Sequence, residues 1–369
     1  MRFVAAFLAV LTSVACGAGS PTTPAAPVTQ EAAEATFVAA LRDRVEAATA
    51  TDQFSGAVLV TRDGRILFAG AYGRSDRERG ISNTPATQFR VGSMNKMITA
   101  VAALQLVQAG ILRLDAPLGT YLPNYPNAEV ASSVTLHHLL THTGGTGDIF
   151  GPEFTAHRTE LRTVDDYLRL YGSRGLRFPA GAQWEYSNYG FILLGAVIEK
   201  VTGTSYHDHV AAQVLGPAGM TATGSEPETS PVPARSVGYT RQLVPGSLVS
   251  NAETLPYRGS PAGGGYSTVE DLARFAMALR EHRLLDPAHT ELILKGKVET
   301  GFQGVQYAYG FFDRVAAGRR FVGHSGGALG MSGDLAFEPG GGYVVVILSN
   351  FDPPAATELT DYILPRLPR

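Results

Sequence analysis

The chain has 369 residues, of which 44% are hydrophobic and 17% are charged, and its formal net charge is −3. These values are typical of a globular protein with a sizeable core, and they argue against intrinsic disorder. The small negative charge, without a long run of basic residues, argues against nucleic acid as a partner.

The N-terminus resembles an export signal. An apolar stretch from residue 3 to residue 15 follows the basic Arg2, and it is too short to cross a bilayer. Cys16 ends this stretch in an imperfect lipoprotein cleavage box, in which serine stands where leucine is usual. We therefore expect a signal peptide over residues 1–16 and an exported protein of the cell envelope. It would be anchored to the membrane through a lipid on Cys16 or, alternatively, simply secreted.

A flexible linker is expected over residues 17–34, which are small, rich in proline and without apolar periodicity. We expect the rest of the chain, residues 35–369, to form one domain. It begins with a helical pattern over 35–50 and two strand-like runs over 56–61 and 66–71. The dipeptide Asp63-Gly64 between these runs is typical of a hairpin turn.

The next helical run, from 93 to about 107, begins with two residues that can carry chemistry. Ser93 and Lys96 are three positions apart, so a helix places the hydroxyl and the amine on one face. A serine becomes nucleophilic when a base takes its proton, and a lysine can act as that base when burial lowers its pKa. This spacing also arises by chance, so the pair alone is a hypothesis.

The middle of the chain, about 110–255, is expected to form an inserted helical subdomain of short helices and loops. Tyr186 and Asn188 lie there, directly before a helical run. A lysine ammonium near the Tyr186 hydroxyl would favour the phenolate, which could then act as a base. The Asn188 amide can both donate and accept hydrogen bonds. The alternative for this pair is an ordinary helix start with a packed tyrosine beside it.

Strand-like runs return towards the C-terminus. The expected elements are a helix to about 279, strands over 306–314, 320–323, 331–337 and 343–349, and a last helix over about 356–364. Strands at both ends and helices between them predict an α+β fold. In this α/β/α sandwich, an antiparallel β-sheet built from both chain ends is flanked by helices, so residues far apart in the sequence can line one cleft.

A glycine-rich segment, His324-Ser325-Gly326-Gly327, lies between two of the expected strands. Its glycines would let a strand edge approach a ligand closely, and a backbone N–H there could point at an oxyanion. Taken by itself, the segment is more typical of a glycine-rich turn between strands.

Together, Ser-x-x-Lys, Tyr-x-Asn and His-x-Gly resemble the motifs of the serine β-lactamase-related hydrolases. This family includes class C β-lactamases, DD-peptidases and carboxylesterases. Further segments that resemble it are 110–117, 136–143, 187–195, 216–220 and 263–268. The resemblance implies that Ser93 is the acylated nucleophile, Lys96 its activating partner and Tyr186 the general base. Which of the last two takes the first proton stays open.

For substrate binding, the resemblance implies that Asn188 and the segment from His324 to Gly327 hold the substrate. The backbone N–H groups of Ser93 and Gly327 would form the oxyanion hole. His324 departs from class C β-lactamases, which carry lysine there. Lysine is a permanent cation for a substrate carboxylate, whereas histidine is mostly neutral at pH 7, so this departure argues against efficient β-lactam hydrolysis.

We therefore expect a serine hydrolase that cleaves a D-alanyl peptide or a small carboxylic ester through an acyl-enzyme on Ser93. A class C type β-lactamase and a penicillin-binding sensor without turnover are the alternatives. A nucleophile elbow at residues 323–327 would need a later histidine, and none follows His324.

A zinc site is the other alternative. His138 and His142 have the spacing of a zinc-binding helix but lack its glutamate, so they are more simply interpreted as surface or helix-terminal histidines. We expect no metal and no cofactor. We also expect a monomer whose partner is a small-molecule or peptide substrate.

Overall fold

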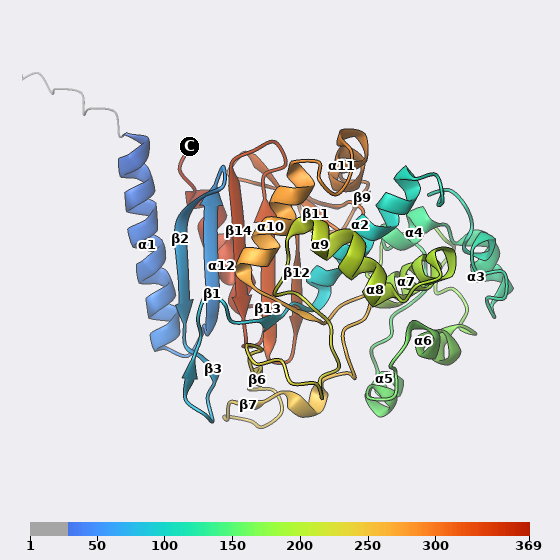
Figure 1. Cartoon of the computed structure of the whole chain (residues 1–369), viewed down its shortest axis with the longest axis horizontal. Coiled ribbons are helices and arrows are strands. Elements are labelled where there is room, and N and C mark those ends of the chain that lie inside the picture. Colours follow the sequence, from blue (N-terminus) through green and yellow to red (C-terminus); the bar gives the residue numbers. More distant parts are fainter. Residues whose placement is uncertain (1–28) are drawn as a thin grey trace, which may run out of the picture.

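Residues 29–369 are described by the computed structural model, which is built around an eight-stranded sheet (Figure 1). The predicted signal peptide with Cys16, and the linker up to residue 28, lie outside this range. The strand order is β2-β1-β14-β13-β12-β11-β10-β9, and all neighbours are antiparallel. The bounds are β1 Gly56–Arg62, β2 Arg65–Tyr72, β9 Val298–Glu299, β10 Val305–Tyr307, β11 Phe312–Ala316, β12 Arg319–Ala328, β13 Met331–Phe337 and β14 Tyr343–Ser349. Because β1 pairs with β14, both ends of the chain contribute to one sheet, which confirms the prediction.

Helices cover both faces of the sheet, so the predicted α/β/α sandwich is confirmed (Figure 1). The four main covering helices are α1 (Gln30–Ala50), α12 (Ala355–Ile363), α2 (Asn95–Gln108) and α10 (Val269–Arg280). On one face, Leu41 of α1 shares a core with Val58 of β1. On the other face, Phe275 of α10 shares a core with Leu59. Val58 and Leu59 belong to different cores because successive side chains of a strand point to opposite faces.

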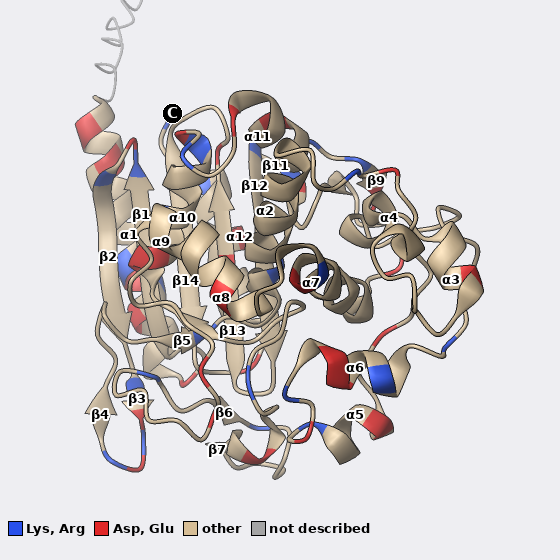
Figure 2. Ribbon diagram, turned by 45° about the vertical axis from the view of Figure 1, so that its right-hand side comes forward, with Lys and Arg blue, Asp and Glu red and all other residues tan. Residues whose placement is uncertain are grey.

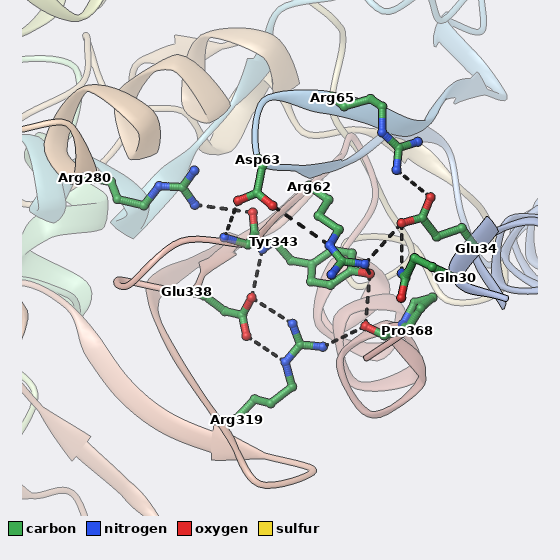
Figure 3. Close-up of polar contacts among 11 residues, drawn as sticks. Gln30, Glu34, Arg62, Asp63, Arg65, Arg280, Arg319, Glu338, Tyr343 and Pro368 are labelled. Carbon is green, nitrogen blue, oxygen red and sulfur yellow. Dashed lines mark hydrogen bonds and ion pairs between the residues drawn. The ribbon is translucent and has the colours of Figure 1, made fainter. Parts of the chain in front are cut away.

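The first helix begins at Gln30, so residues 30–34 are helical and not part of the predicted linker. The carboxylate of Glu34 accepts hydrogen bonds from Arg62 and Arg65 at the β1–β2 hairpin (Figure 3). These contacts hold the first turns of α1 against the sheet. The composition of the segment did not reveal them, because the partners are about thirty residues away along the chain.

A second group of helices lies beside the sheet, at the right of Figure 1. It contains α3 (Ala128–Ser133), α4 (Leu136–Leu140), α5 (Pro152–His157), α6 (Val164–Tyr171), α7 (Asn188–Thr202) and α8 (Tyr206–Val210), whereas the short α9 (Gly216–Ala218) lies next to α10, nearer the middle of the figure. Within the range of the predicted subdomain, the last α-helix ends at Ala218, and a 3-10 turn follows at Ala252–Thr254. Residues 219–265 are mostly irregular because proline and glycine recur there. The remaining α-helix is α11 (Pro287–Leu294), and the short strands are β3 (Arg74–Asp76), β4 (Ile81–Ser82), β5 (Phe89–Arg90), β6 (Tyr239–Thr240), β7 (Val249–Ser250) and β8 (Tyr266–Ser267).

Two of the predicted strands have different bounds in the structure. The strand expected over 306–314 is divided into β10 and β11, and Gly310 between them has a φ of +75°. The strand expected over 320–323 continues to Ala328, so the glycine-rich segment lies within β12 and not in a turn. In the described structure β11 pairs with β12 only up to Gly323, so beyond that point this edge of β12 is open to other segments.

Acidic and basic residues are interspersed along the ribbon (Figure 2), in keeping with the small net charge. None of the described helices combines the length and apolar character needed to span a membrane. Within residues 29–369, no group of three or more His, Cys, Asp or Glu side chains is arranged to hold a metal ion.

Candidate active site

Ser93 lies in a short 3-10 turn, Gly92–Met94, that leads directly into α2. One turn later, the Lys96 amine donates a hydrogen bond to the Ser93 hydroxyl, with 3.2 Å between Nζ and Oγ. The Lys96 side chain is fully buried, whereas Ser93 is half-buried. The spacing in the sequence therefore does bring a hydroxyl and an amine together, as helical geometry requires.

The environment of Lys96 favours loss of its proton. Burial lowers the pKa of Lys96 to about 7, and the nearby Asp148 carboxylate opposes this shift. Besides Ser93, the amine donates to Asn188 Oδ1 at 2.6 Å and to the carbonyl of Ala262. A substantial fraction of the amine is therefore neutral at pH 7, and this fraction can accept a proton from Ser93.

Tyr186 lies beside this pair, just before α7. The Lys96 nitrogen is 4.7 Å from the centroid of the Tyr186 ring. Burial raises the pKa of Tyr186 above its ordinary value, although a hydrogen bond with Ser93 opposes the shift. The expectation that lysine would favour the phenolate is therefore wrong, because desolvation disfavours the charged form of the phenol more strongly. At neutral pH Tyr186 keeps its proton and can donate it.

The backbone around Ser93 lies against strand β12. Gly92 has a φ of +51°, and a Cβ at this position would lie 3.1 Å from the Gly327 nitrogen. A Cβ at Gly326 would lie 2.0 Å from the Val91 oxygen and 3.0 Å from the Ser93 nitrogen. Glycine at these two positions therefore lets the amides of Ser93 and Gly327 come close together. Two adjacent N–H groups can stabilise the charge of an oxyanion.

A cavity opens directly beside Ser93. Ser93, Asn188 and Gly327 are among the residues that line it. Its other walls are mostly apolar, and they include Ile149, Phe150, Phe154, Tyr167, Leu255, Pro256, Ala262 and Met331. Arg258 is the one charged side chain among the described residues that line it. A mostly apolar pocket with a few polar groups is typical of a small-molecule site.

Comparison with known proteins identifies the family. The family model for beta-lactamase matches residues 41–367. The chain belongs to the beta-lactamase family.

Esterase EstB from Burkholderia gladioli is 38% identical over 217 residues, which are 54% of this chain and 53% of EstB. The penicillin-binding protein structure from Bacillus halodurans has a TM-score of 0.78 and 31% identity, covering 89% of this chain and 98% of its own. A D-stereospecific amidohydrolase from Streptomyces sp. has a TM-score of 0.76 and 28% identity, with the same coverage of both chains.

In this member of the beta-lactamase family, His324 cannot bind a substrate in the way the sequence implied. The side chain is buried, with 2% of its surface exposed. Burial lowers the pKa of His324 to about 3, so the ring is neutral. Nδ1 donates to the Ser325 carbonyl at 2.5 Å, and Nε2 accepts from the Tyr307 hydroxyl at 3.0 Å. With both ring nitrogens engaged inside the protein, His324 offers the substrate neither a charge nor a hydrogen bond.

Two residues that sequence reasoning did not place in this site belong to it. His142, interpreted from the sequence as a surface or helix-terminal residue, is buried with its ring 4.2 Å from that of Tyr186. Its Nδ1 accepts from the Ser187 N–H at 3.1 Å, which holds the segment that carries Tyr186. Asp148 accepts hydrogen bonds from Asn188. The sequence carried no signal for either contact, because each joins segments about forty residues apart.

Proposed function

We propose that this protein is a serine hydrolase that cleaves carboxylic esters with an apolar acyl group through an acyl-enzyme on Ser93. The observation that carries the proposal is the mostly apolar cavity that is lined by both Ser93 and Gly327. An acyl chain lying against apolar walls loses water-exposed surface, which favours binding. The family includes a protein named as an esterase, EstB, which supports the same reaction class.

In the proposed acylation step, the neutral Lys96 amine takes the proton of Ser93, and Oγ attacks the carbonyl carbon. The N–H groups of Ser93 and Gly327 stabilise the oxyanion. Tyr186 donates a proton to the departing alcohol as the ester bond breaks, and Lys96 then returns a proton to Tyr186. Water releases the acyl group by the same steps in reverse, so that both groups regain their starting protonation states.

Replacement of Tyr186 by phenylalanine should slow acylation about 100-fold, because the ring stays but the donated proton is lost. The burst of p-nitrophenol in stopped-flow experiments with a p-nitrophenyl ester measures this step. Tyr189→Phe is the matched control, since its hydroxyl is also buried but pairs with Tyr125 at 3.0 Å. An acylation rate in Tyr186→Phe equal to that of the control would contradict the role given to the phenol.

The substrate class is tested with purified protein and four probes: p-nitrophenyl acetate, p-nitrophenyl hexanoate, a D-Ala-D-Ala peptide and a fluorescent penicillin. We expect kcat/KM for the hexanoate to exceed that for the acetate about tenfold or more, since each buried methylene contributes about 0.8 kcal/mol. Both esters should be hydrolysed faster than the penicillin. Faster penicillin turnover would point to a β-lactamase, and a stoichiometric penicillin burst without turnover would point to a sensor.

A D-aminoacyl amide or peptide is the second candidate substrate, and Arg258 is the observation that favours it. Its Nε donates to the Ser225 carbonyl at 2.8 Å, and no described carboxylate forms an ion pair with it. Its charge could therefore meet the carboxylate of a peptide in the cavity. Preference for D-Ala-D-Ala over its C-terminal amide would favour this candidate. The D-stereospecific amidohydrolase among its structural neighbours is consistent with it.

We also propose that the protein is exported to the cell envelope. The proposal rests on the N-terminal sequence, including Cys16, which lies outside the described residues. Fractionation of cells that produce the full chain would test it. Recovery of wild type and Cys16→Ser alike in the cytoplasmic fraction would contradict export.

A further inference from the structure

The Asp148 carboxylate holds the Asn188 side chain in one orientation. Asn188 Nδ2 donates to Asp148 Oδ1 at 2.9 Å and to Oδ2 at 3.1 Å. An ionised carboxylate only accepts hydrogen bonds, so the NH₂ group of the amide must face Asp148. The amide oxygen therefore faces the other way, where it accepts from the Lys96 amine at 2.6 Å. A continuous chain of hydrogen bonds thus joins Asp148, Asn188, Lys96 and Ser93.

Asp148 itself is held firmly in the loop between α4 and α5. Its Oδ1 accepts from the N–H of Ile149 at 2.7 Å and from the N–H of Asn188 at 3.3 Å. No described lysine or arginine forms an ion pair with this carboxylate. Within the described chain no ion pair therefore neutralises the Asp148 carboxylate, and the Asn188 amide connects it to Lys96 by hydrogen bonds.

Among the described titratable groups near Lys96, Asp148 is the one whose interaction with the amine opposes the effect of burial. His142 and His324 lie close enough to interact with Lys96, but burial lowers the pKa of each ring and keeps it neutral. Burial also raises the pKa of Tyr186, which stays protonated. The protonation of Lys96 is therefore a balance between burial, which removes the proton, and Asp148, which retains it.

We propose that Asp148 is a positioning residue that acts through Asn188 to direct the Lys96 amine at Ser93 and to set the pH above which the enzyme is active. The proposal rests on the proposed function in that Lys96 accepts the Ser93 proton. Asp148 does not touch the reacting atoms, since Asn188 stands between them.

Asp148→Asn tests the proposal, because it removes the charge and keeps the shape. Burial of Lys96 is then unopposed, so the amine loses its proton more easily. We expect the low-pH side of the kcat/KM profile to move down by about one pH unit. The plateau should fall about tenfold, since the Asn188 amide is free to turn over. A lower plateau with an unmoved profile would indicate a merely structural role and overturn the proposal.

Two further variants serve as controls. Asp148→Glu keeps the charge, so its profile should stay near that of the wild type even if the plateau falls. Asp165→Asn removes an exposed carboxylate of α6 that pairs with Arg169, and it should change neither the profile nor the plateau. A shift in Asp165→Asn as large as that in Asp148→Asn would also overturn the proposal.

A direct titration separates this proposal from the proposed function. The chain has four lysines, so ¹⁵N labelling of the amines and NMR can follow each one, with Lys96→Met to assign the signal. Lys96 should lose its proton at a lower pH in Asp148→Asn than in wild type, while Lys297 stays unchanged. This readout needs no substrate. If Lys96 shifts but Ser93→Ala keeps full activity, the reaction mechanism is wrong and the role of Asp148 stands; an unshifted Lys96 overturns that role alone.

Discussion

Replacement of Ser93 by alanine is expected to lower kcat by about 10⁴-fold or more for every substrate that the wild type hydrolyses. Without Oγ no acyl-enzyme can form. The measurement is steady-state hydrolysis of a p-nitrophenyl ester, together with mass spectrometry for the covalent acyl adduct. The wild type should gain the mass of the acyl group, and the variant should not.

Ser132→Ala is the matched control for this experiment. Ser132 is exposed on α3, and its hydroxyl donates only to the Glu129 carbonyl. It should therefore behave as the wild type. If Ser93→Ala hydrolysed the ester at a rate near that of this control, the nucleophile would be another residue and the proposed mechanism would be wrong.

Replacement of Lys96 by methionine is expected to lower kcat/KM by about 10³-fold or more, with little change in substrate binding. Methionine fills a similar volume, but it cannot accept the proton of Ser93. The wild type should also show a low-pH limb in kcat/KM, with activity rising as pH increases through about 7. The sign follows because the active form of Lys96 is the neutral amine, which is populated above its pKa.

The pH profile of Lys96→Met is the decisive part of this measurement. Its residual activity should lose the limb near pH 7. Lys200→Met, in the last turn of α7 and exposed, should keep both the activity and the limb. If the low-pH limb of the wild type persisted unchanged in Lys96→Met, the limb would belong to another titrating group, and Lys96 would not be the base.

Much of the fold could be predicted from the sequence, because buried strands and amphipathic helices leave local patterns. The runs expected over 331–337 and 343–349 coincide with β13 and β14, whose residues are all buried and mainly apolar. The strand expected over 320–323 is shorter than β12, because the C-terminal part of β12 is rich in glycine, which has low strand propensity. There the strand persists because the turn that carries Ser93 packs against it, and only glycine leaves room for that contact.

The sequence by itself determined the pair of Ser93 and Lys96, because a spacing of three on a helix needs no information beyond local geometry. Only the tertiary structure decided the proton states. Burial lowers the pKa of Lys96 to about 7 and raises the pKa of Tyr186, because segments far apart in the chain enclose both side chains. The structure also places the Asp148 carboxylate against the Asn188 amide, and it buries the His324 side chain. Desolvation and hydrogen bonding depend on which segments meet in space, and the order of residues does not encode that locally.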